Sequence, residues 1–387
     1  MKNLMQKGLL IMLVVFIFMN NTLLVSAKEE TDLKLYARSA LLMDADSGRV
    51  LYEENGYAIM PMASTTKIMT CILALESGKL QEYVTVSRNA QGQPKVRLGI
   101  REGEAYKLED LLYSLMLESH NDTAVAIAEY LGGSVEGFAD MMNAKAKELG
   151  CENTYFITPN GLDATKDGKM HSSTAYDMAL LTAYALENEA FCNLITTNSH
   201  TFKEQNGRKQ YTVYNKDAFL GMYDGAIGVK TGFTNGAGYC FVGAVERDDA
   251  KFISVVLASG WPPNKSWKWA DTGTLMDYGT QNYFRCSYIS SEIYGPIPVE
   301  EGIAEQAAVE AERQEISMLL RADEEIITEY ELKTKLTAPV EKGEVVGYER
   351  YLLEDEVVAE FPIKTVENVD KITLWYCFSK VVTGFLI

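Results

Sequence analysis

The chain has 387 residues, more than one hydrophobic core normally spans, so we expect two or three domains and exclude a single small module. Its formal net charge of −18 argues against a nucleic-acid binder, because such proteins need clustered positive charge to displace counterions. The three histidines and six scattered cysteines show no zinc or redox spacing, so we expect no metal ion or cofactor and assign no disulfide.

The N-terminus has the pattern of a secretory signal peptide over residues 1–27. Lys2 and Lys7 precede an apolar run over 9–19, and small residues stand at the cleavage position after Ala27. The run is well short of the ~20 residues that span a bilayer, so an uncleaved membrane anchor is the weaker interpretation. The pattern predicts an exported protein whose mature chain begins at residue 28.

Residues 28–288 are predicted to form an α+β domain. Two strands joined by a turn at 46–48 come first, followed by a helix from Ser64 to Gly78 whose apolar residues lie almost all round, which indicates an interior helix. Strands, then helices, then strands predict helices packed against an antiparallel sheet. The later elements are helices over 107–118, 123–133, 135–149 and from about 171, and β-rich segments from residue 226.

The remaining chain divides into two parts. A small all-β domain is predicted over 292–368, where proline-punctuated sequence gives way to short β-like segments. Segment 369–387 carries an apolar stripe, which predicts an amphipathic helix that lies at a membrane surface. The alternative is a terminal helix or strand docked on the β domain. The stripe recurs at helical spacing and consists of Leu374, Phe378, Val381 and Phe385.

Ser64-Thr65-Thr66-Lys67 places a hydroxyl and an amine three residues apart, so both side chains project from one face of the predicted helix. Serine becomes a strong nucleophile when a base removes its proton, and lysine can be that base when burial or a second cation lowers its pKa. A lone S-x-x-K arises about once by chance in a chain of this length. This one lies on a helix predicted to be buried, where an unpaired lysine is costly.

Ser119-His120-Asn121 lies at a tight turn between two predicted helices. The hydroxyl of Ser119 could relay a proton, and the amide of Asn121 could both donate to and accept from a substrate peptide bond. Helix capping by Asn121 or Asp122 is a structural role compatible with this one. The similar triplet at 87–89 follows a strand-like segment without helix signals around it, so we reject it.

Lys230-Thr231-Gly232 follows a β-like segment and is the only K-T-G in the chain. On a strand, Lys230 and Thr231 would present a cation and a hydroxyl to a substrate carboxylate, while Gly232 would let the substrate backbone approach closely. Taken alone, the tripeptide is more simply a strand end followed by a turn. Its position after the two preceding motifs favours the functional interpretation.

These three motifs, in this order, resemble those of the penicillin-binding protein and serine β-lactamase superfamily. The segments PMASTTKIMT, LESHNDTAVAIAEYLGG and GVKTGFTNGAGYCFVGAVERD resemble low-molecular-weight D-alanyl-D-alanine carboxypeptidases. The resemblance implies a β-lactamase/transpeptidase-like catalytic fold. It also implies a protein at the outer face of the membrane that trims peptidoglycan stem peptides ending in D-Ala-D-Ala and is inhibited covalently by β-lactams.

The resemblance implies a role for each motif residue. Ser64 would attack the carbonyl between the two terminal D-alanines and form an acyl-enzyme that water hydrolyses, with Lys67 as its base and Ser119 as a proton relay. The backbone N–H groups of Ser64 and Phe233 would form the oxyanion hole. The other residues would bind substrate: Asn121 at the acyl-side amide, Lys230 through its positive potential, Thr231 at the terminal carboxylate, and Gly232 beside the approaching backbone.

Two positions depart from the family's pattern. His120 occupies the middle of S-x-N, where the family more often has a small residue, and it would alter the turn or add a titrating group. In the family a basic residue, usually arginine, follows the third motif and binds the carboxylate. Here the candidates are Lys268 and Lys265, of which we prefer Lys268; a lysine would replace the bidentate arginine fork by a point charge.

Two other functions are alternatives. A β-lactamase-like hydrolase would share the motifs, but the chain lacks the E-x-x-L-N element with which class A enzymes place the deacylating water. A catalytically silent cell-wall scaffold would have lost the nucleophile, the base or the K-T-G, all of which are intact. Slow release of a penicillin adduct argues against the first alternative, and release of D-alanine from a pentapeptide argues against the second.

Overall fold

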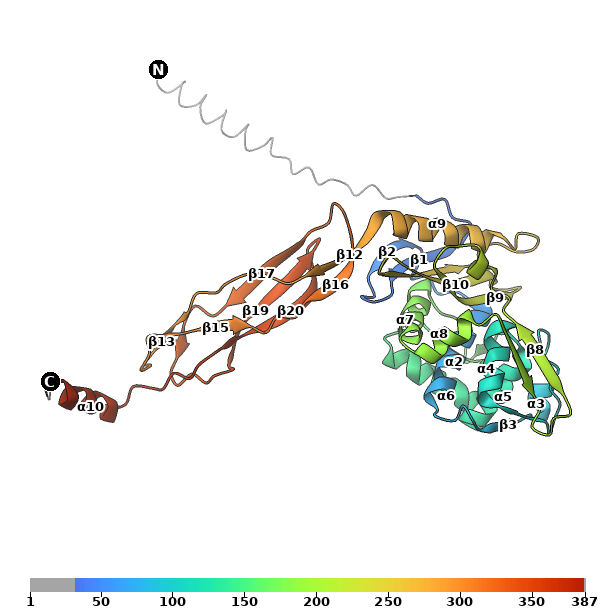
Figure 1. Ribbon diagram of the computed structural model, residues 1–387, viewed down its shortest axis with the longest axis horizontal. Helices are drawn as coiled ribbons and strands as arrows, with labels where there is room; N and C mark the ends of the chain where they lie inside the picture. The colour runs from blue at the N-terminus through green and yellow to red at the C-terminus, as the bar shows by residue number, and fades with distance from the viewer. Residues whose placement is uncertain (1–31, 386–387) are drawn as a thin grey trace, which may run out of the picture. The chain divides into compact units, whose positions relative to one another are not determined.

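A computed structural model describes residues 32–385, and the predicted signal peptide over 1–27 lies outside them. The first domain is built on a five-stranded sheet in the order β2-β1-β11-β10-β9, all of whose neighbours are antiparallel (Figure 1). The early hairpin and the later β-rich segments therefore join in one sheet. Its strands are β1 (Ser39–Asp44), β2 (Val50–Glu54), β9 (Ala226–Thr234), β10 (Gly238–Arg247) and β11 (Ala250–Leu257).

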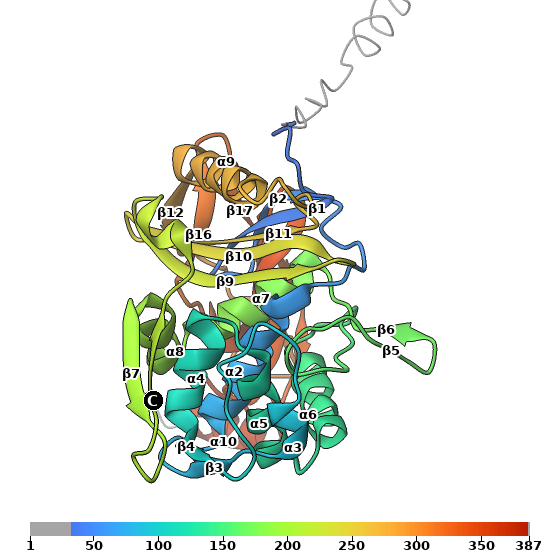
Figure 2. The ribbon, with the colours of Figure 1, turned by 90° about the vertical axis from the view of Figure 1, so that its right-hand side faces the viewer.

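Helices cover both faces of this sheet, which explains why every residue of β1 is buried. Helix α9 (Trp267–Asn282) lies on one face and the larger helical layer lies on the other (Figure 2). The sequence between β2 and β9 forms η1 (Ala63–Thr66), α2 (Lys67–Glu76), β3 (Tyr83–Thr85), α3 (Arg88–Gln91), β4 (Ala105–Lys107), α4 (Leu108–Leu117), α5 (Asn121–Gly132), α6 (Val135–Glu148), β5 (Thr165–Lys166), β6 (Lys169–Met170), α7 (Ala175–Leu186), α8 (Glu189–Thr196), β7 (Ser199–Lys203), β8 (Gln210–Tyr214) and η2 (Ala218–Gly221).

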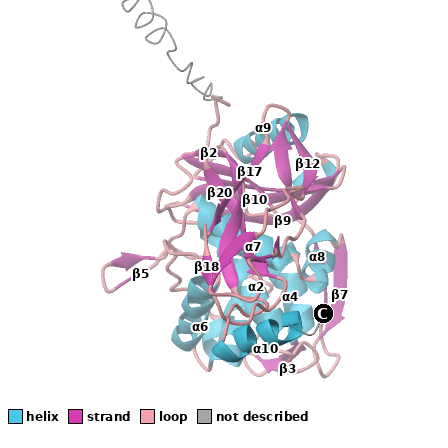
Figure 3. Cartoon of the chain, turned by 90° about the vertical axis from the view of Figure 1, so that its left-hand side faces the viewer, coloured by secondary structure: helices cyan, strands magenta, loops and turns pink. Residues whose placement is uncertain are grey.

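The second domain is β-rich, and its strands are drawn in magenta in a view coloured by secondary structure (Figure 3). Four antiparallel strands form its main sheet in the order β15-β20-β19-β17, and a smaller sheet has the order β14-β13-β18. Its strands are β12 (Tyr283–Tyr288), β13 (Ile297–Glu300), β14 (Gln306–Ala307), β15 (Val309–Ala311), β16 (Ile316–Arg321), β17 (Ile326–Leu332), β18 (Leu336–Thr337), β19 (Val345–Leu353) and β20 (Glu356–Thr365).

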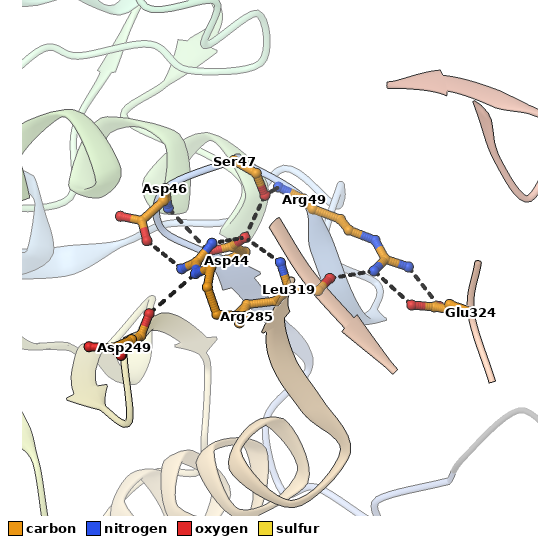
Figure 4. Close-up of polar contacts among 8 residues, drawn as sticks. All are labelled: Asp44, Asp46, Ser47, Arg49, Asp249, Arg285, Leu319 and Glu324. Carbon is orange, nitrogen blue, oxygen red and sulfur yellow. Dashed lines mark hydrogen bonds and ion pairs between the residues drawn. The ribbon is translucent and has the colours of Figure 1, made fainter. Parts of the chain in front are cut away.

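A polar cluster fastens the β1–β2 hairpin to the β12–β16 ribbon (Figure 4). The buried carboxylate of Asp44 accepts two bonds from the guanidinium of Arg285 (3.1 Å each) and one from the backbone N–H of Leu319 (3.1 Å). Arg49 donates to the Leu319 carbonyl (2.6 Å) and forms a bidentate pair with Glu324 (2.7 and 2.8 Å). Paired, largely buried charges of this kind hold the two hairpins in a defined register.

The described chain ends in α10 (Leu374–Phe385), which has several exposed apolar side chains. Leu374 is 92% exposed and Trp375 is 76% exposed, and Phe378 is also mostly accessible. Just before this helix, the backbone N–H of Ile372 donates to Glu301 O (2.8 Å) on the β-rich domain. Among residues 32–385, no helix combines the length and the hydropathy needed to cross a membrane.

Candidate active site

Ser64 lies in η1, a turn of 3₁₀ helix that leads directly into α2. Two threonine hydroxyls close this turn, because Thr65 Oγ1 donates to Met62 O (2.7 Å) and Thr66 Oγ1 donates to Ala63 O (2.8 Å). The helix predicted from Ser64 is therefore present, with a first turn that is tighter than an α-helix. The turn keeps the serine and the lysine three residues later on the same face.

The amine of Lys67 is held by three hydrogen bonds and has no exposed surface. Its Nζ lies 3.0 Å from Ser64 Oγ, 2.9 Å from Asn121 Oδ1 and 2.7 Å from the carbonyl oxygen of Asn160. These three acceptors match the three N–H directions of an ammonium group. Lys67 thus joins the first two sequence motifs and fixes its own position relative to the Ser64 hydroxyl.

Burial holds the pKa of Lys67 well below the usual range of a lysine, because the interior disfavours the charged form. The positive charge of Lys230 lowers this pKa further, and the carboxylate of Asp122 opposes the shift. A lysine with a lowered pKa has a population of neutral amine that can take a proton from a serine hydroxyl. The geometry and the electrostatics of this pair both suit a nucleophile and its base.

The Asn160 carbonyl was not among the residues predicted from sequence. It accepts from Lys67 and, at 3.3 Å, from the Ser64 hydroxyl. The loop comes this close because the next residue is Gly161, with φ +83°; a Cβ there would lie 1.9 Å from Ala63 O. The glycine in P-N-G-L-D was a visible signal for a tight turn, but nothing in the sequence showed what the turn touches.

Ser119 and Asn121 lie at the short connection between α4 and α5, as predicted. Ser119 has φ 64°, and its Oγ is buried without a hydrogen-bond partner. Asn121 accepts from Lys67 through Oδ1, and its Nδ2 donates to Pro94 O (3.3 Å). The asparagine is therefore in direct contact with the Ser64–Lys67 pair through the lysine, while the Ser119 hydroxyl is left without a protein partner.

The capping role considered for Asn121 or Asp122 is wrong. His120 occupies the N-cap position of α5, and its side chain makes no capping hydrogen bond. Asp122 instead accepts from the backbone N–H groups of Leu98 (2.9 Å) and Gly99 (2.7 Å), and the Asn121 N–H donates to Val96 O (2.7 Å). Both residues hold the loop that precedes β4 next to the site.

Strand β9 brings the third motif to η1. A Cβ on Gly232 would lie 3.0 Å from the backbone nitrogen of Ser64, so only glycine allows this approach without displacement. Lys230 is buried, and its Nζ donates to Thr231 O (3.0 Å). Burial lowers the pKa of Lys230 to about 7, the charge of Lys268 lowers it as well, and Asp217 opposes them. The three motifs thus converge on one site.

The residues that follow Lys230 form the outer part of this strand. Thr231 is half-buried and Phe233 is 38% exposed, with its ring centroid 4.6 Å from that of Tyr239. Thr234 Oγ1 donates to Asp163 Oδ1 (2.8 Å), which joins the end of β9 to the loop that carries the Asn160 carbonyl. The strand that carries the third motif is therefore joined to the loop that contacts Lys67.

Lys268 lies in the first turn of α9 and is 3% exposed, whereas Lys265 is exposed. Its Nζ lies 4.5 Å from the ring centroid of Trp269 and 5.3 Å from that of Tyr239. Aromatic faces stabilise a cation without neutralising it. Burial lowers the pKa of Lys268 to about 8, with a further contribution from Lys265, and Asp217 opposes the shift.

Sequence comparison assigns this chain to a known family. Residues 25–260 match the peptidase S11 family, described as D-alanyl-D-alanine carboxypeptidase. The chain belongs to this family. Residues 291–371 match the C-terminal domain of penicillin-binding protein 5. The D-alanyl-D-alanine carboxypeptidase DacF of Bacillus subtilis is 32% identical over 354 residues, which cover 89% of this chain and 88% of that protein. The chain is thus a serine-type D-Ala-D-Ala carboxypeptidase acting on peptidoglycan.

Solved structures of other carboxypeptidase relatives have the same fold. Penicillin-binding protein 5 from Haemophilus influenzae superposes with a TM-score of 0.71 at 26% identity, over 87% of this chain and 98% of that one. Penicillin-binding protein D2 from Listeria monocytogenes, solved in an ampicillin-bound form, gives a TM-score of 0.56 at 31% identity, over 64% of this chain and 99% of that one.

Asp217 is a further acidic group of the carboxypeptidase site that sequence reasoning missed. It caps η2 through Oδ1, which accepts from the Phe219 N–H (3.0 Å), while its Oδ2 is buried without a partner. Burial raises the pKa of Asp217 to about 6, and the charges of Lys230 and Lys268 oppose the shift. An unpaired buried carboxylate oxygen is costly. The positive charges of Lys230 and Lys268 offset part of this cost.

The other histidines of the carboxypeptidase support structure. His171 Nε2 lies 2.9 Å from Thr66 Oγ1 behind the nucleophile turn, and its Nδ1 accepts from the Ile157 N–H (2.9 Å). His200 lies in β7, and its Nε2 lies 2.7 Å from Asp110 Oδ1. In the described part of the chain, no group of three or more histidine, cysteine or acidic side chains is arranged to hold a metal ion.

Proposed function

We propose that this carboxypeptidase removes the terminal D-alanine of a stem peptide through an acyl-enzyme on Ser64. The observation that carries the proposal is the 3.0 Å contact between Ser64 Oγ and the fully buried amine of Lys67, whose pKa burial lowers. A nucleophile, a base within hydrogen-bond distance and a third group that orients the base are the parts such a reaction needs. Asn121 and the Asn160 carbonyl supply the orientation.

In acylation, Ser64 Oγ bonds to the carbonyl carbon between the two D-alanines while neutral Lys67 takes its proton. The tetrahedral intermediate collapses when the C–N bond breaks and the leaving amine receives, through Ser119, the proton that Lys67 had taken; the Ser119 hydroxyl has no competing protein partner. Water then adds to the ester, a proton returns to Ser64, and the shortened peptide leaves as a carboxylic acid. Each step uses a group of this chain or water, and no redox change occurs.

Substrate binding falls to residues on either side of the nucleophile. The Asn121 Nδ2 donates to the acyl-side amide, and the backbone N–H groups of Ser64 and Phe233 stabilise the oxyanion; loss of one such donor typically raises a barrier by ~3 kcal/mol. Gly232 admits the substrate backbone. Lys230 and Thr231 meet the terminal carboxylate with a positive potential and a hydroxyl.

Lys268 is proposed as a second cation for the same carboxylate. Its support is burial beside Tyr239, on the strand next to β9, and its charge is felt by Lys230. We expect Lys268→Met to raise KM for a D-Ala-D-Ala peptide about tenfold with a smaller change in kcat. Lys265→Met is the matched control, because Lys265 is exposed. A larger effect of the Lys265 change would transfer the role to that residue.

Penicillin sensitivity follows from the same nucleophile. Intact-mass spectrometry after brief exposure to penicillin should show one adduct, mapped to the peptide that contains Ser64. Ser64→Ala should abolish the adduct, and Ser77→Ala, at the other end of the same helix, should keep it. Labelling of the Ser64→Ala protein would refute the assignment. An adduct lost within seconds would favour a β-lactamase-like hydrolase, which shares the nucleophile.

Turnover tests the established activity at this site separately. A pentapeptide ending in D-Ala-D-Ala should release one D-alanine per molecule with the wild-type protein and none with Ser64→Ala. A protein that is acylated by penicillin but releases no D-alanine would match the silent scaffold. The two measurements together separate the carboxypeptidase from both alternatives.

The C-terminal segment 369–387 is proposed to bind the membrane surface of an exported protein, with 1–27 as its cleaved signal. Its support is the apolar stripe of α10, which leaves Leu374 and Trp375 exposed, while Lys380 is placed to stay in water. Such a helix buries its apolar face at the headgroup boundary. Deletion of 373–387 from a protein without its signal should abolish vesicle binding and preserve D-alanine release. Unchanged vesicle binding would contradict the proposal.

A further inference from the structure

His120 connects the two helices that carry the middle motif, and nothing in the proposed reaction uses it. It follows Ser119, precedes Asn121 and is 4% exposed. Its backbone N–H donates to Ser114 O in α4 (3.4 Å), and its carbonyl accepts from Thr123 Oγ1 in α5 (2.9 Å). One residue therefore links the end of one helix to the start of the next.

The imidazole ring of His120 is held at both nitrogens. Nδ1 lies 2.8 Å from the buried hydroxyl of Ser114, and Nε2 lies 3.3 Å from Glu118 Oε2. Glu118 is itself fixed, because its other oxygen accepts from the Tyr214 N–H of β8 (2.9 Å) and lies 3.7 Å from Lys216 Nζ. The ring thus ties the turn to the body of α4 and to a neighbouring hairpin.

Ser119 needs this support. Its φ of 64° is a left-handed conformation, which is strained for a residue with a side chain, and its own Oγ makes no hydrogen bond that could hold it. Glu118 and His120 precede and follow Ser119 in the chain, and their side chains contact each other. The left-handed backbone of Ser119 is therefore flanked by two residues that this contact joins.

We propose that His120 is a positioning residue, which as a neutral imidazole clamps the turn so that Asn121 keeps its contact with Lys67 and Ser119 keeps its backbone conformation. Both ring contacts are satisfied when the proton is on Nε2, which donates to Glu118, while Nδ1 accepts from the Ser114 hydroxyl. Protonation makes Nδ1 a donor and reverses the Ser114 hydrogen bond. The Ser114 hydroxyl can accept this bond by rotating, so acid acts chiefly by adding a buried positive charge near Lys67 and Lys230, and we expect the acylation rate to fall at low pH.

Charged groups face His120 from four elements. Burial lowers its pKa most; Asp122 of α5 and Glu118 at the end of α4 raise it, and Lys67 of α2 and Lys230 of β9 lower it. The net shift is downward, so the ring is neutral at neutral pH. Its proton would also add positive charge facing Lys67 and Lys230, so the turn and the site respond to the same event.

The test measures the second-order rate of acylation by a labelled penicillin from pH 5 to 9, with kcat and KM for a D-Ala-D-Ala peptide. His120→Gly removes both ring contacts and should lower the acylation rate about 100-fold, chiefly through kcat, as expected for misplaced catalytic groups. His120→Asn and His120→Gln retain one contact each, so their acylation rates should be about tenfold higher than that of His120→Gly. His200→Gln removes a histidine paired with Asp110 and should match the wild type.

The pH profile separates positioning from mere stability. Relative to His120→Asn, the wild type should lose activity in acid with the midpoint at which the His120 ring titrates by NMR, assignable because the chain has only three histidines. Glu118→Gln should move that midpoint lower, since a charge that favours the proton is gone. Identical acid profiles of wild type and His120→Asn, or rates within twofold for His120→Gly, would overturn the proposal. It rests on the Ser64 acyl-enzyme, whose own failure would appear as an unlabelled wild type.

Discussion

The two halves of the active site differ in how their charged groups are compensated. On the nucleophile side, Lys67 has three hydrogen-bond acceptors within 3.0 Å. On the carboxylate side, Lys230 has one backbone acceptor, and Lys268 lies over aromatic rings. Within residues 32–385 no ion pair neutralises either of these two lysines. The base is fully oriented before substrate arrives, whereas the two binding lysines are influenced by the Asp217 carboxylate without pairing with it and are left to pair with the substrate carboxylate.

This difference implies that substitutions on the nucleophile side act on the chemical step and substitutions on the other side act on binding. Preorganised groups contribute most where charge changes during the reaction, because they need not move. A cation without a fixed partner attracts an anionic ligand and loses that attraction when it loses its proton. The following predictions test the two halves in order of expected effect.

Lys67→Met should have the largest effect. It keeps the length of the side chain and removes the base, so we expect the acylation rate to fall about 10³-fold or more, with little change in the affinity of the initial complex. Single-turnover labelling at several penicillin concentrations separates these two quantities. Lys147→Met, an exposed lysine on α6, is the control. Acylation within tenfold of the wild type would mean that another group takes the Ser64 proton.

Gly161→Ala tests whether the Asn160 loop orients the base. The added Cβ would collide with Ala63 O at 1.9 Å, so the loop must move away from the nucleophile turn. We expect kcat to fall about 100-fold, because a displacement of about 1 Å is enough for such a loss. Gly168→Ala has a similar φ of +76° and open space around its Cβ, so it controls for backbone strain alone. Equal losses in both variants would assign the effect to strain.

The pH dependence should separate the two halves in the unmodified enzyme. Lys67 acts as a neutral amine, so kcat rises with pH as it loses its proton. Lys230, with a pKa of about 7, and Lys268, with a pKa of about 8, act as cations, so KM should rise about tenfold between pH 6 and 9. Steady-state kinetics on a D-Ala-D-Ala peptide measure both. A KM that is constant over this range would remove these lysines from carboxylate binding.

Asp217→Asn sharpens that experiment. The carboxylate of Asp217 raises the pKa of both lysines, so its removal should move the increase in KM to lower pH. The kcat profile should move less than the KM profile, since Asp217 reaches Lys67 only indirectly, through the charge of Lys230. Asp140→Asn, an exposed acid on α6, should leave both profiles unchanged. A parallel shift of kcat and KM would show that the two halves are not independent.

The motif residues that form the active site could be predicted from sequence, because the spacing of these residues reflects the chemistry that they perform. Ser64 and Lys67 are three residues apart on a helix, and β9 brings Gly232 against Ser64, as the order of the motifs suggested. The α+β fold followed the same logic, since its strands and helices have distinct periodicities. Such signals are local, so they survive without knowledge of the tertiary structure.

The groups that sequence reasoning missed act through their tertiary surroundings. Every residue has a carbonyl, so nothing distinguished that of Asn160 until the fold placed it beside Lys67. Asp217 gains its importance from burial near two lysines that follow it in sequence. Asp122 had the right residue type for a cap, but the amides of the adjacent loop were better partners. Burial and long-range pairing decided each case.

The smallest effect on activity is expected at the polar cluster between the β1–β2 hairpin and the β12–β16 ribbon. Arg285→Gln leaves the buried Asp44 carboxylate without its bidentate partner, so the free energy of unfolding should fall by about 3 kcal/mol in urea titrations. Arg88→Gln breaks an exposed pair with Glu102 and should change it by less than about 0.5 kcal/mol. Neither change touches a site residue, so kcat and KM should stay within twofold of the wild type. A selective rise in KM for Arg285→Gln would mean that this cluster communicates with the lysines of the carboxylate side, and a selective fall in kcat would mean that it supports the nucleophile turn.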